Sequence, residues 1–277
     1  MSASLAALSP EVRQYLVVTG NYWAFTLTDG ALRMLVVLHF HGLGYTPLEV
    51  ALLFLFYEIF GVITNLLGGW LGARLGLNAT MNVGLLLQVV ALAMLLLPPE
   101  RLTVTWVMAA QALSGIAKDL NKMSAKSAIK LLVPADAQGA LYRWVALLTG
   151  SKNALKGFGF FLGGVLLTAL GFTLAVGVMC AALFVVWVFS LLVLRRDLGK
   201  STAKPKCRHL FSKSRSINLL SAARLFLFAA RDVWIVVALP VYLSSQLGWA
   251  YHSVGAFLAL WVIGYGIVQS LAPRFTG

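Results

Sequence analysis

The sequence predicts an all-α integral membrane protein with about eight transmembrane helices. Of its 277 residues, 60% are hydrophobic and 11% are charged, whereas a soluble domain is roughly half apolar and about a quarter charged. The mean hydropathy of +0.86 agrees with this class. The net charge of +13 lies mostly in the gaps between apolar runs, which is typical of membrane topology and not of a nucleic-acid-binding surface.

Eight apolar runs each approach or exceed the roughly 20 residues that a helix needs to cross a bilayer. Helix breakers separate them, among them Pro98-Pro99, Pro134, Gly171 and the polar stretch 195–215. The N-terminal residues lack the pattern of a signal peptide, so the first run is expected to stay as a helix. The runs cover residues 15–39, 47–71, 79–97, 102–122, 142–170, 173–194, 219–243 and 254–272.

The distribution of Lys and Arg predicts which ends of the spans face the cytoplasm. With the N-terminus inside, the inner connections hold Arg74, Arg143, a ladder of lysines and the basic stretch 195–215, and the outer ones hold only Arg101. The positive-inside rule therefore predicts a multi-pass protein of the inner (cytoplasmic) membrane with a cytoplasmic N-terminus. Residues 195–216 are expected to form a basic cytoplasmic linker, either solvated or in contact with lipid headgroups.

An internal repeat follows this linker. Asp29, the run LVVL (35–38) and Leu43-Gly44-Tyr45 resemble Asp232, VVAL (236–239) and Leu247-Gly248-Trp249. A six-helix unit, a basic loop and the start of a second copy is the plan of transporters built from two parallel halves. We therefore expect a six-helix N-terminal half at 1–194 and the first two helices of a second half at 217–277.

The lysine ladder consists of Lys118, Lys122, Lys126 and Lys130, four residues apart each time. On a helix this spacing forms one slowly drifting stripe. The outer pair, Lys126 and Lys130, is expected at the membrane edge, and Lys118 and Lys122 are candidates to line a pathway. In the next helix Lys152 and Lys156 also share a face and lie deep in the span, where they are expected to line a cavity.

Ionisable residues inside spans cost roughly 2.5–3.5 kcal/mol each on insertion scales, so each needs a partner or a role. Asp29 and Arg33 lie four residues apart, and they form either an internal ion pair or an anion site with a proton-carrying partner. Glu58, in the middle of its span, is either a proton carrier or paired to another helix, because desolvation favours the neutral form of an unpaired carboxylate. Arg231 and Asp232 are also ionisable and need a partner or a role. Because adjacent residues do not share a helix face, they cannot pair with each other as Asp29 and Arg33 can.

Among the ionisable residues that could face a cavity inside the membrane, basic residues outnumber acidic ones. Unpaired positive charge there is costly, so this surplus favours an anionic solute. The sequence shows neither a nucleophile–base pair nor a cysteine or histidine ligand cluster, so we expect no enzyme activity, no metal and no cofactor. The predicted anion-binding residues are Arg33, Lys118, Lys122, Lys152, Lys156 and Arg231, and the predicted proton-coupling residues are Asp29, Glu58 and Asp232.

The two-half plan resembles the major facilitator superfamily, and one loop resembles its motif of Gly, three residues, Asp, Arg, one residue and Gly. Gly69, Arg74 and Gly76 match this motif, whereas Ala73 replaces its aspartate. More specifically, five stretches look like the organoarsenical efflux permeases of the ArsJ type. They are NYWAFTLTDGALRMLVVLHFH (21–41), LFLFYEIFGVITNLLGGWLGARLGLN (53–78), AQALSGIAKDLNKMSAKSAIK (110–130), LTGSKNALKGFGFFLGG (148–164) and ARDVWIVVALPVYL (230–243).

This resemblance implies export of an arsenylated phosphoglycerate, 1-arseno-3-phosphoglycerate, and hence arsenate resistance. It also implies a functional link to glyceraldehyde-3-phosphate dehydrogenase, which makes the ester in the cytoplasm. Because the superfamily plan has twelve spans, four spans, on the order of 100 residues, are expected to be missing after Gly277. The alternatives are another phosphorylated or carboxylated metabolite as cargo, and a truncated membrane fragment that does not transport.

Overall fold

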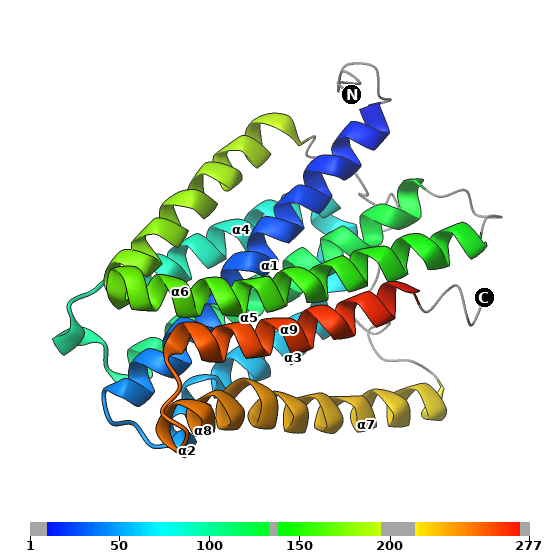
Figure 1. Cartoon of the computed structure of the whole chain (residues 1–277). Helices are drawn as coiled ribbons and strands as arrows, with labels where there is room; N and C mark the ends of the chain where they lie inside the picture. The colour runs from blue at the N-terminus through cyan, green and yellow to red at the C-terminus, as the bar shows by residue number, and fades with distance from the viewer. Residues whose placement is uncertain (1–9, 133–137, 195–213, 272–277) are drawn as a thin grey trace, which may run out of the picture.

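The computed structural model describes residues 10–132, 138–194 and 214–271, and all regular secondary structure within these ranges is helical (Figure 1). Most of the helices run roughly along one direction, as in a membrane bundle. The helices are α1 (Pro10–Gly42), α2 (Pro47–Leu53), α3 (Leu55–Leu75), α4 (Leu77–Met94), η2 (Pro99–Arg101), α5 (Val104–Leu132), α6 (Gln138–Val193), α7 (Arg215–Asp232), the π-helix η4 (Val233–Ala238), α8 (Leu239–Ser245) and α9 (Tyr251–Leu271).

The predicted runs correspond to these helices, with three differences of detail. The run 47–71 is divided at Phe54 into α2 and α3. The fourth run continues ten residues beyond its expected end, so that α5 reaches Leu132. The fifth and sixth runs form α6, whose direction reverses at Gly171, where φ is 72°. That left-handed conformation strongly favours glycine.

Four of the described helical segments are long and apolar enough by themselves to cross a membrane. They are Pro47–Asn65, Leu77–Met94, Val145–Val193, which contains two of the predicted runs, and Tyr251–Leu271. The helices α1 and α5 are longer than any single crossing requires. Polar and ionisable residues such as Asp29, Arg33 and Asp119 lower their hydropathy, and the same residues form the candidate site.

Local sequence signals explain how several of these helices begin and bend. Before α2, the Thr46 hydroxyl accepts a hydrogen bond from the Glu49 amide, while the Glu49 carboxylate accepts one from the Thr46 amide. This capping box satisfies donors that a helix start leaves open. Between α7 and α8, Pro240 lies in the first turn of α8 and lacks an amide hydrogen, which accounts for the π-helical turns just before it.

The internal repeat is visible in the backbone. Gly44 has a φ of 97° and Gly248 a φ of 66°, and each follows one of the two repeated helical segments. Both turns are therefore built around a left-handed glycine at the position that the sequence alignment makes equivalent. The predicted linker lies almost entirely outside the described residues, so the division into two halves stays a prediction.

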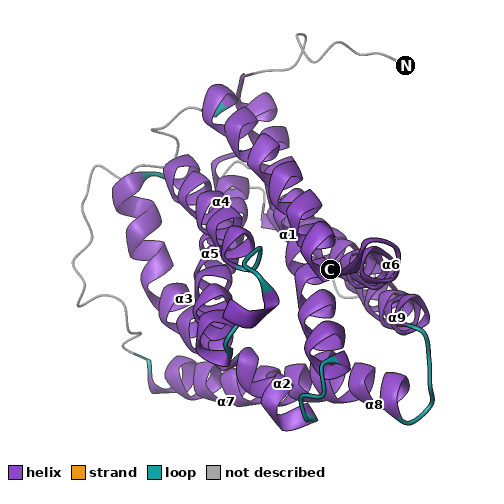
Figure 2. Cartoon of the chain, turned by 90° about the vertical axis from the view of Figure 1, so that its left-hand side faces the viewer, coloured by secondary structure: helices purple, strands orange, loops and turns teal. Residues whose placement is uncertain are grey.

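Helix α6 is packed between two neighbours, α1 on one face and α9 on the other (Figures 1 and 2). Toward α1, a Cβ atom at Gly159 would come within 2.6 Å of the Leu27 carbonyl oxygen. Toward α9, one at Gly157 would come within 2.9 Å of the Ala259 carbonyl, and one at Gly164 within 2.5 Å of the Tyr251 carbonyl. These small residues let the helix backbones touch, as in other membrane bundles.

Helix α5 is held in a similar way between α3 and α4. A Cβ atom at Gly115 would overlap the backbone of Tyr57 in α3. On the other side, a Cβ atom at Gly84 in α4 would come within 3.1 Å of the Ala117 carbonyl and would overlap the Asn121 side chain. This close packing brings the polar positions of α3 and α5 to the same level of the bundle.

Candidate functional site

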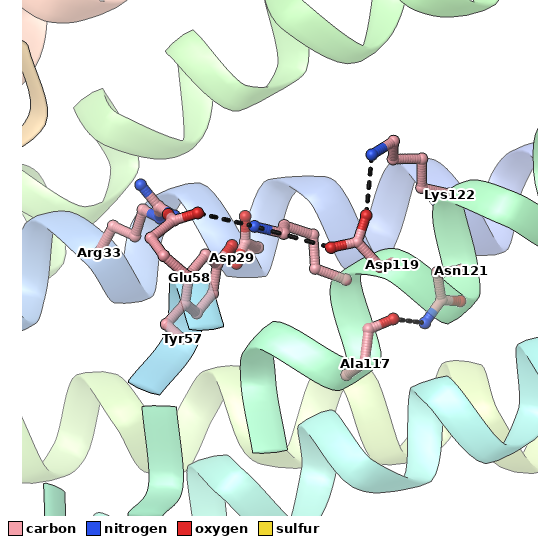
Figure 3. Close-up of polar contacts among 9 residues, drawn as sticks. Asp29, Arg33, Tyr57, Glu58, Ala117, Asp119, Asn121 and Lys122 are labelled. Atoms are coloured by element: carbon pink, nitrogen blue, oxygen red, sulfur yellow. Dashed lines mark hydrogen bonds and ion pairs between the residues drawn. The ribbon is translucent and has the colours of Figure 1, made fainter. Parts of the chain in front are cut away.

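Helices α1, α3 and α5 bring five charged side chains into one continuous chain of ion pairs, which we call the charge ladder (Figure 3). Arg33 Nη2 lies 2.6 Å from Glu58 Oε1, and Lys118 Nζ lies 3.6 Å from Glu58 Oε2. Lys118 Nζ is also 4.0 Å from Asp119 Oδ2, and Lys122 Nζ is 2.8 Å from Asp119 Oδ1. Three helices are therefore linked through alternating charges.

Tyr57 organises the middle of this charge ladder. Its hydroxyl donates a hydrogen bond of 2.7 Å to Asp29 Oδ1. Its ring centre lies 4.1 Å from Arg33 Cζ and 4.0 Å from Lys118 Nζ. Cations close to an aromatic ring are attracted by its quadrupole. The fully buried Tyr57 ring therefore supports both cations that Glu58 neutralises.

The charge ladder is buried at some positions and accessible at others. The side chain of Arg33 is 3% exposed and that of Asp119 is 5% exposed. Glu58, in the first turn of α3, is 38% exposed, and Lys122, in the middle of α5, is 32% exposed. The charge ladder is therefore covered by protein at Arg33 and Asp119 and partly uncovered at Glu58 and Lys122.

A second group of cations lies on α6. Lys152 and Lys156 are half-buried, and Lys156 Nζ lies 5.7 Å from the centre of the Phe160 ring. The charge on Lys152 is subject to repulsion from four other ammonium groups, those of Lys156, Lys122, Lys126 and Lys118. We call these five residues the lysine cluster; Lys152 and Lys156 belong to α6, and Lys118, Lys122 and Lys126 belong to α5. Lys118 and Lys122 are members of the charge ladder as well. A Cβ atom at Gly30 would lie 2.7 Å from the Lys156 carbonyl oxygen, so the lysine-bearing turn of α6 packs directly on the Asp29 turn of α1.

The structure brings together most of the residues predicted from sequence and separates others. Arg33, Glu58, Lys118 and Lys122 belong to the charge ladder, with Asp29 attached through Tyr57, and Lys152 and Lys156 lie within electrostatic range of it. Arg231 is exposed at the end of α7. The side chains of Asp232 and Lys130 lie outside the described part of the structure.

The contacts of Asp29 and Arg33 lie on α3: the Tyr57 hydroxyl donates a hydrogen bond to Asp29, and Arg33 pairs with Glu58. Glu58 therefore has the partner on another helix that the sequence offered as one of its two interpretations. Sequence reasoning missed Tyr57. An aromatic residue in a span usually belongs to the core, so Tyr57 gave no signal except its position next to Glu58. Asp119 stands in the sequence between Lys118 and Lys122, but its role as a bridge between them needs the helix geometry.

The family model for the major facilitator superfamily matches residues 15–277. The chain belongs to the major facilitator superfamily.

Solved structures of superfamily transporters show the same fold. A proton-dependent oligopeptide transporter is 17% identical, with a TM-score of 0.56, over 95% of this chain and 54% of that chain. An auto-inhibited peptide transporter of the POT family is 20% identical, with a TM-score of 0.57, over 95% of this chain and 53% of that one. A D-xylose–proton symporter is 14% identical, with a TM-score of 0.52, over 93% of this chain and 66% of that chain.

The chain therefore spans about half the length of the first two of these transporters. No curated protein sequence matches it. The likeness to the solved structures concerns the fold alone, at these identities. Membership of the superfamily gives this chain the fold of a membrane transporter family, which agrees with the predicted class.

The superfamily loop motif lies where α3 passes into α4. Gly76 has a φ of 93° and its amide donates a hydrogen bond to the Gly72 carbonyl, 2.9 Å away. The backbone conformation there is one that side chains rarely adopt, which explains glycine at this position of the motif. The Arg74 guanidinium lies 4.7 Å from the centre of the Trp70 ring. In the absence of the motif's aspartate, this ring supplies a contact for the arginine.

Proposed function

We propose that this chain transports an organic anion out of the cytoplasm, and that the anion is an arsenylated phosphoglycerate, 1-arseno-3-phosphoglycerate. The superfamily fold supports the transport of a small solute. The anionic character is supported by the lysine cluster, and the identity of the cargo rests on the sequence resemblance to organoarsenical efflux permeases.

The observation that carries the proposal is the surplus of positive charge around Lys152. The charge ladder is nearly balanced, because Glu58 and Asp119 neutralise much of the charge of its cations. Lys152 has no carboxylate partner among the described residues, and the lysines whose charges act on it include Lys156 of its own helix and the partly neutralised Lys118 and Lys122 of α5. A concentration of cations in a membrane bundle is costly unless an anion shares the site.

The chemistry of the cargo fits such a site. A phosphate monoester carries roughly −1.5 to −2 charges near neutral pH. Lysine ammonium groups attract these oxygens as point charges, and arginine binds them in a bidentate fork. We assign Lys152 and Lys156 to the phosphate or arsenate oxygens. Lys118 and Lys122 would join when the anion competes with Glu58 and Asp119 for them.

In this mechanism the two halves of the transporter rock around the anion site, and a carboxylate carries any coupled proton. Glu58 is the strongest candidate, because protonation would release both Arg33 and Lys118. Asp29 is a second candidate, held by the Tyr57 hydroxyl. Arg231 and Asp232, in the repeat-related helix, would provide the equivalent groups from the second half.

The test is uptake by everted membrane vesicles that contain the chain. The ester is generated in the assay from arsenate and glyceraldehyde-3-phosphate by glyceraldehyde-3-phosphate dehydrogenase. We expect uptake by the wild-type chain and loss of most of it in Lys152→Ala and in Lys156→Ala. Arg101→Ala is the matched control, because it removes an exposed cation of the short helix η2 at the opposite end of the bundle.

Each other outcome has a defined meaning. Unimpaired uptake by both lysine variants would remove them from the anion site. Uptake of 3-phosphoglycerate without arsenate would make another phosphorylated metabolite the cargo. Absence of any uptake by a correctly inserted wild-type chain would favour the non-transporting fragment.

A further inference from the structure

A second set of polar side chains lies outside the charge ladder, on the surfaces where α1, α4 and α5 meet. These side chains are between 0% and 7% exposed. Within the described part of the chain, nine of their polar atoms have no hydrogen-bond partner. They are Thr19 Oγ1 and Tyr22 OH of α1, both amide atoms of Gln88 in α4, and both amide atoms of Gln111, Ser114 Oγ, Asn121 Oδ1 and Ser124 Oγ of α5.

These residues form one seam, which we call the α1–α4–α5 seam. Helices α4 and α5 touch where Gly84 meets Ala117 and Asn121. Helices α1 and α4 touch where Asn21 Nδ2 lies 3.8 Å from Met81 Sδ. Met81, Gly84 and Gln88 share one face of α4, because they are three and four residues apart.

The seam runs along the axis of the bundle. Its members on α5 extend from Gln111 to Ser124, a length of about 20 Å at 1.5 Å per residue. Ser114 and Asn121 are seven residues apart and therefore lie on the same side of α5. Thr19 and Tyr22 are three residues apart on α1 and stand in the sequence on either side of Asn21, which contacts Met81 of α4.

Leaving so many buried polar atoms without partners is energetically implausible. Each orphaned donor or acceptor costs about 1–3 kcal/mol, so nine of them would consume a typical net stability of roughly 5–15 kcal/mol. The atoms include amide donors, carbonyl acceptors and hydroxyls. This mixture fits neither a cation nor an anion, whereas water both donates and accepts and typically uses about three polar partners when buried.

We propose that the α1–α4–α5 seam binds a file of water molecules that ends at the Tyr22 hydroxyl. The charges of both Asp119 and Asp29 act on this hydroxyl, and both carboxylates are only 4% exposed. The file therefore ends at a hydroxyl on which two buried acids of the described residues act, and it approaches this hydroxyl along α4 and α5 and not from the Lys152 side of α6. The inference does not depend on the identity of the cargo.

The test is hydroxyl-radical footprinting of the wild-type chain in lipid nanodiscs. X-ray pulses split bound water, and the radicals oxidise neighbouring methionine and tyrosine side chains. Met81 lies on the seam and Met34 lies on the face of α1 that packs against Gly163, and both are fully buried. We expect Met81 and Tyr22 to be oxidised several times faster than Met34. Equal, slow oxidation of Met81 and Met34 would overturn the proposal.

A variant provides an independent measurement. Gln88→Leu removes two polar atoms from the seam at similar volume. In a hydrated seam, bound waters lose partners, so the melting temperature falls and oxidation of Met81 slows while that of Met34 is unchanged. In a dry seam, the same substitution removes two orphaned atoms and raises the melting temperature, which would contradict the proposal.

Discussion

Glu58 and Tyr57, adjacent in sequence, act on the same two cations in different ways. Glu58 neutralises Arg33 and Lys118 through its two carboxylate oxygens, and the Tyr57 ring supports both from about 4 Å. Because Tyr57 and Glu58 belong to one helical turn, a movement of α3 shifts the carboxylate and the ring together. The charge ladder is therefore sensitive to the position of a single turn of α3.

Two substitutions of Tyr57 separate its hydroxyl from its ring. Tyr57→Phe loses only the hydrogen bond to Asp29, and we expect a loss of about 1.5–3 kcal/mol of stability, as for a bond to a charged group. Tyr57→Leu also loses two cation–ring contacts, each about 0.5–2 kcal/mol, so it should be less stable than Tyr57→Phe. Unfolding in denaturing detergent measures both, and equal stability of the two variants would contradict a role for the ring.

The choice of partners could not be predicted from sequence, and the reason is local. Asp29 is four residues from Arg33 and therefore the obvious partner on one helix, whereas Glu58 is reachable only after α3 packs beside α1. Sequence did predict that these ionisable residues share one site, because each would be too costly alone in a membrane. The sequence did not indicate the α1–α4–α5 seam, since isolated Gln and Ser residues are common in helices.

At the scale of elements, α5 shows what periodicity predicts and what it does not. The four-residue spacing of its lysines predicted a helix with a cationic stripe, and α5 is such a helix. The predicted span ends at residue 122, where hydropathy falls, whereas the helix itself continues to Leu132. Spacing is the same inside and outside a bilayer, so it could not indicate where the helix ends.

The close packing of α3 against α5 has a direct test at Gly115. A Cβ atom at this position would overlap the Tyr57 backbone, so Gly115→Ala should push the two helices apart and cost about 1–3 kcal/mol, as overpacking does. Gly20→Ala is the control, because nothing lies within 4 Å of a Cβ atom there, and it should be neutral or stabilising by up to about 1 kcal/mol. Thermal melts in detergent would show the difference, and equal melting temperatures would contradict the packing argument.

At the scale of the whole molecule, the sequence predicted the class, the succession of spans and the superfamily. Composition alone indicated a membrane protein, and the breakers at Gly171 and Pro98-Pro99 lie where the helices reverse or end. The equivalent turns at Gly44 and Gly248 agree with the repeat. The orientation in the membrane stays a prediction from charge, because the arrangement of the helices does not by itself indicate which end faces the cytoplasm.

The two cysteines of the chain provide a test of this orientation. Cys207 lies in the basic stretch 195–215, and Cys180 lies on α6 with its thiol directed to the Val89 carbonyl, 3.6 Å away. We expect a membrane-impermeant maleimide to label Cys207 in everted vesicles and not in intact spheroplasts. Cys207→Ser is the control that should abolish the labelling, and labelling from outside would reverse the predicted topology.

The two glycine faces of α6 limit how this helix moves. Gly159 faces α1 while Gly157 and Gly164 face α9, and backbone contacts on both sides leave no room for a side chain. If α6 rolled about its own axis, larger residues would be driven into the neighbouring backbones. These contacts therefore oppose rotation of the helix about its own axis. Lys152 and Lys156 consequently keep the same bearing toward α5, so under the proposed function any change in anion affinity has to come from the helices opposite them.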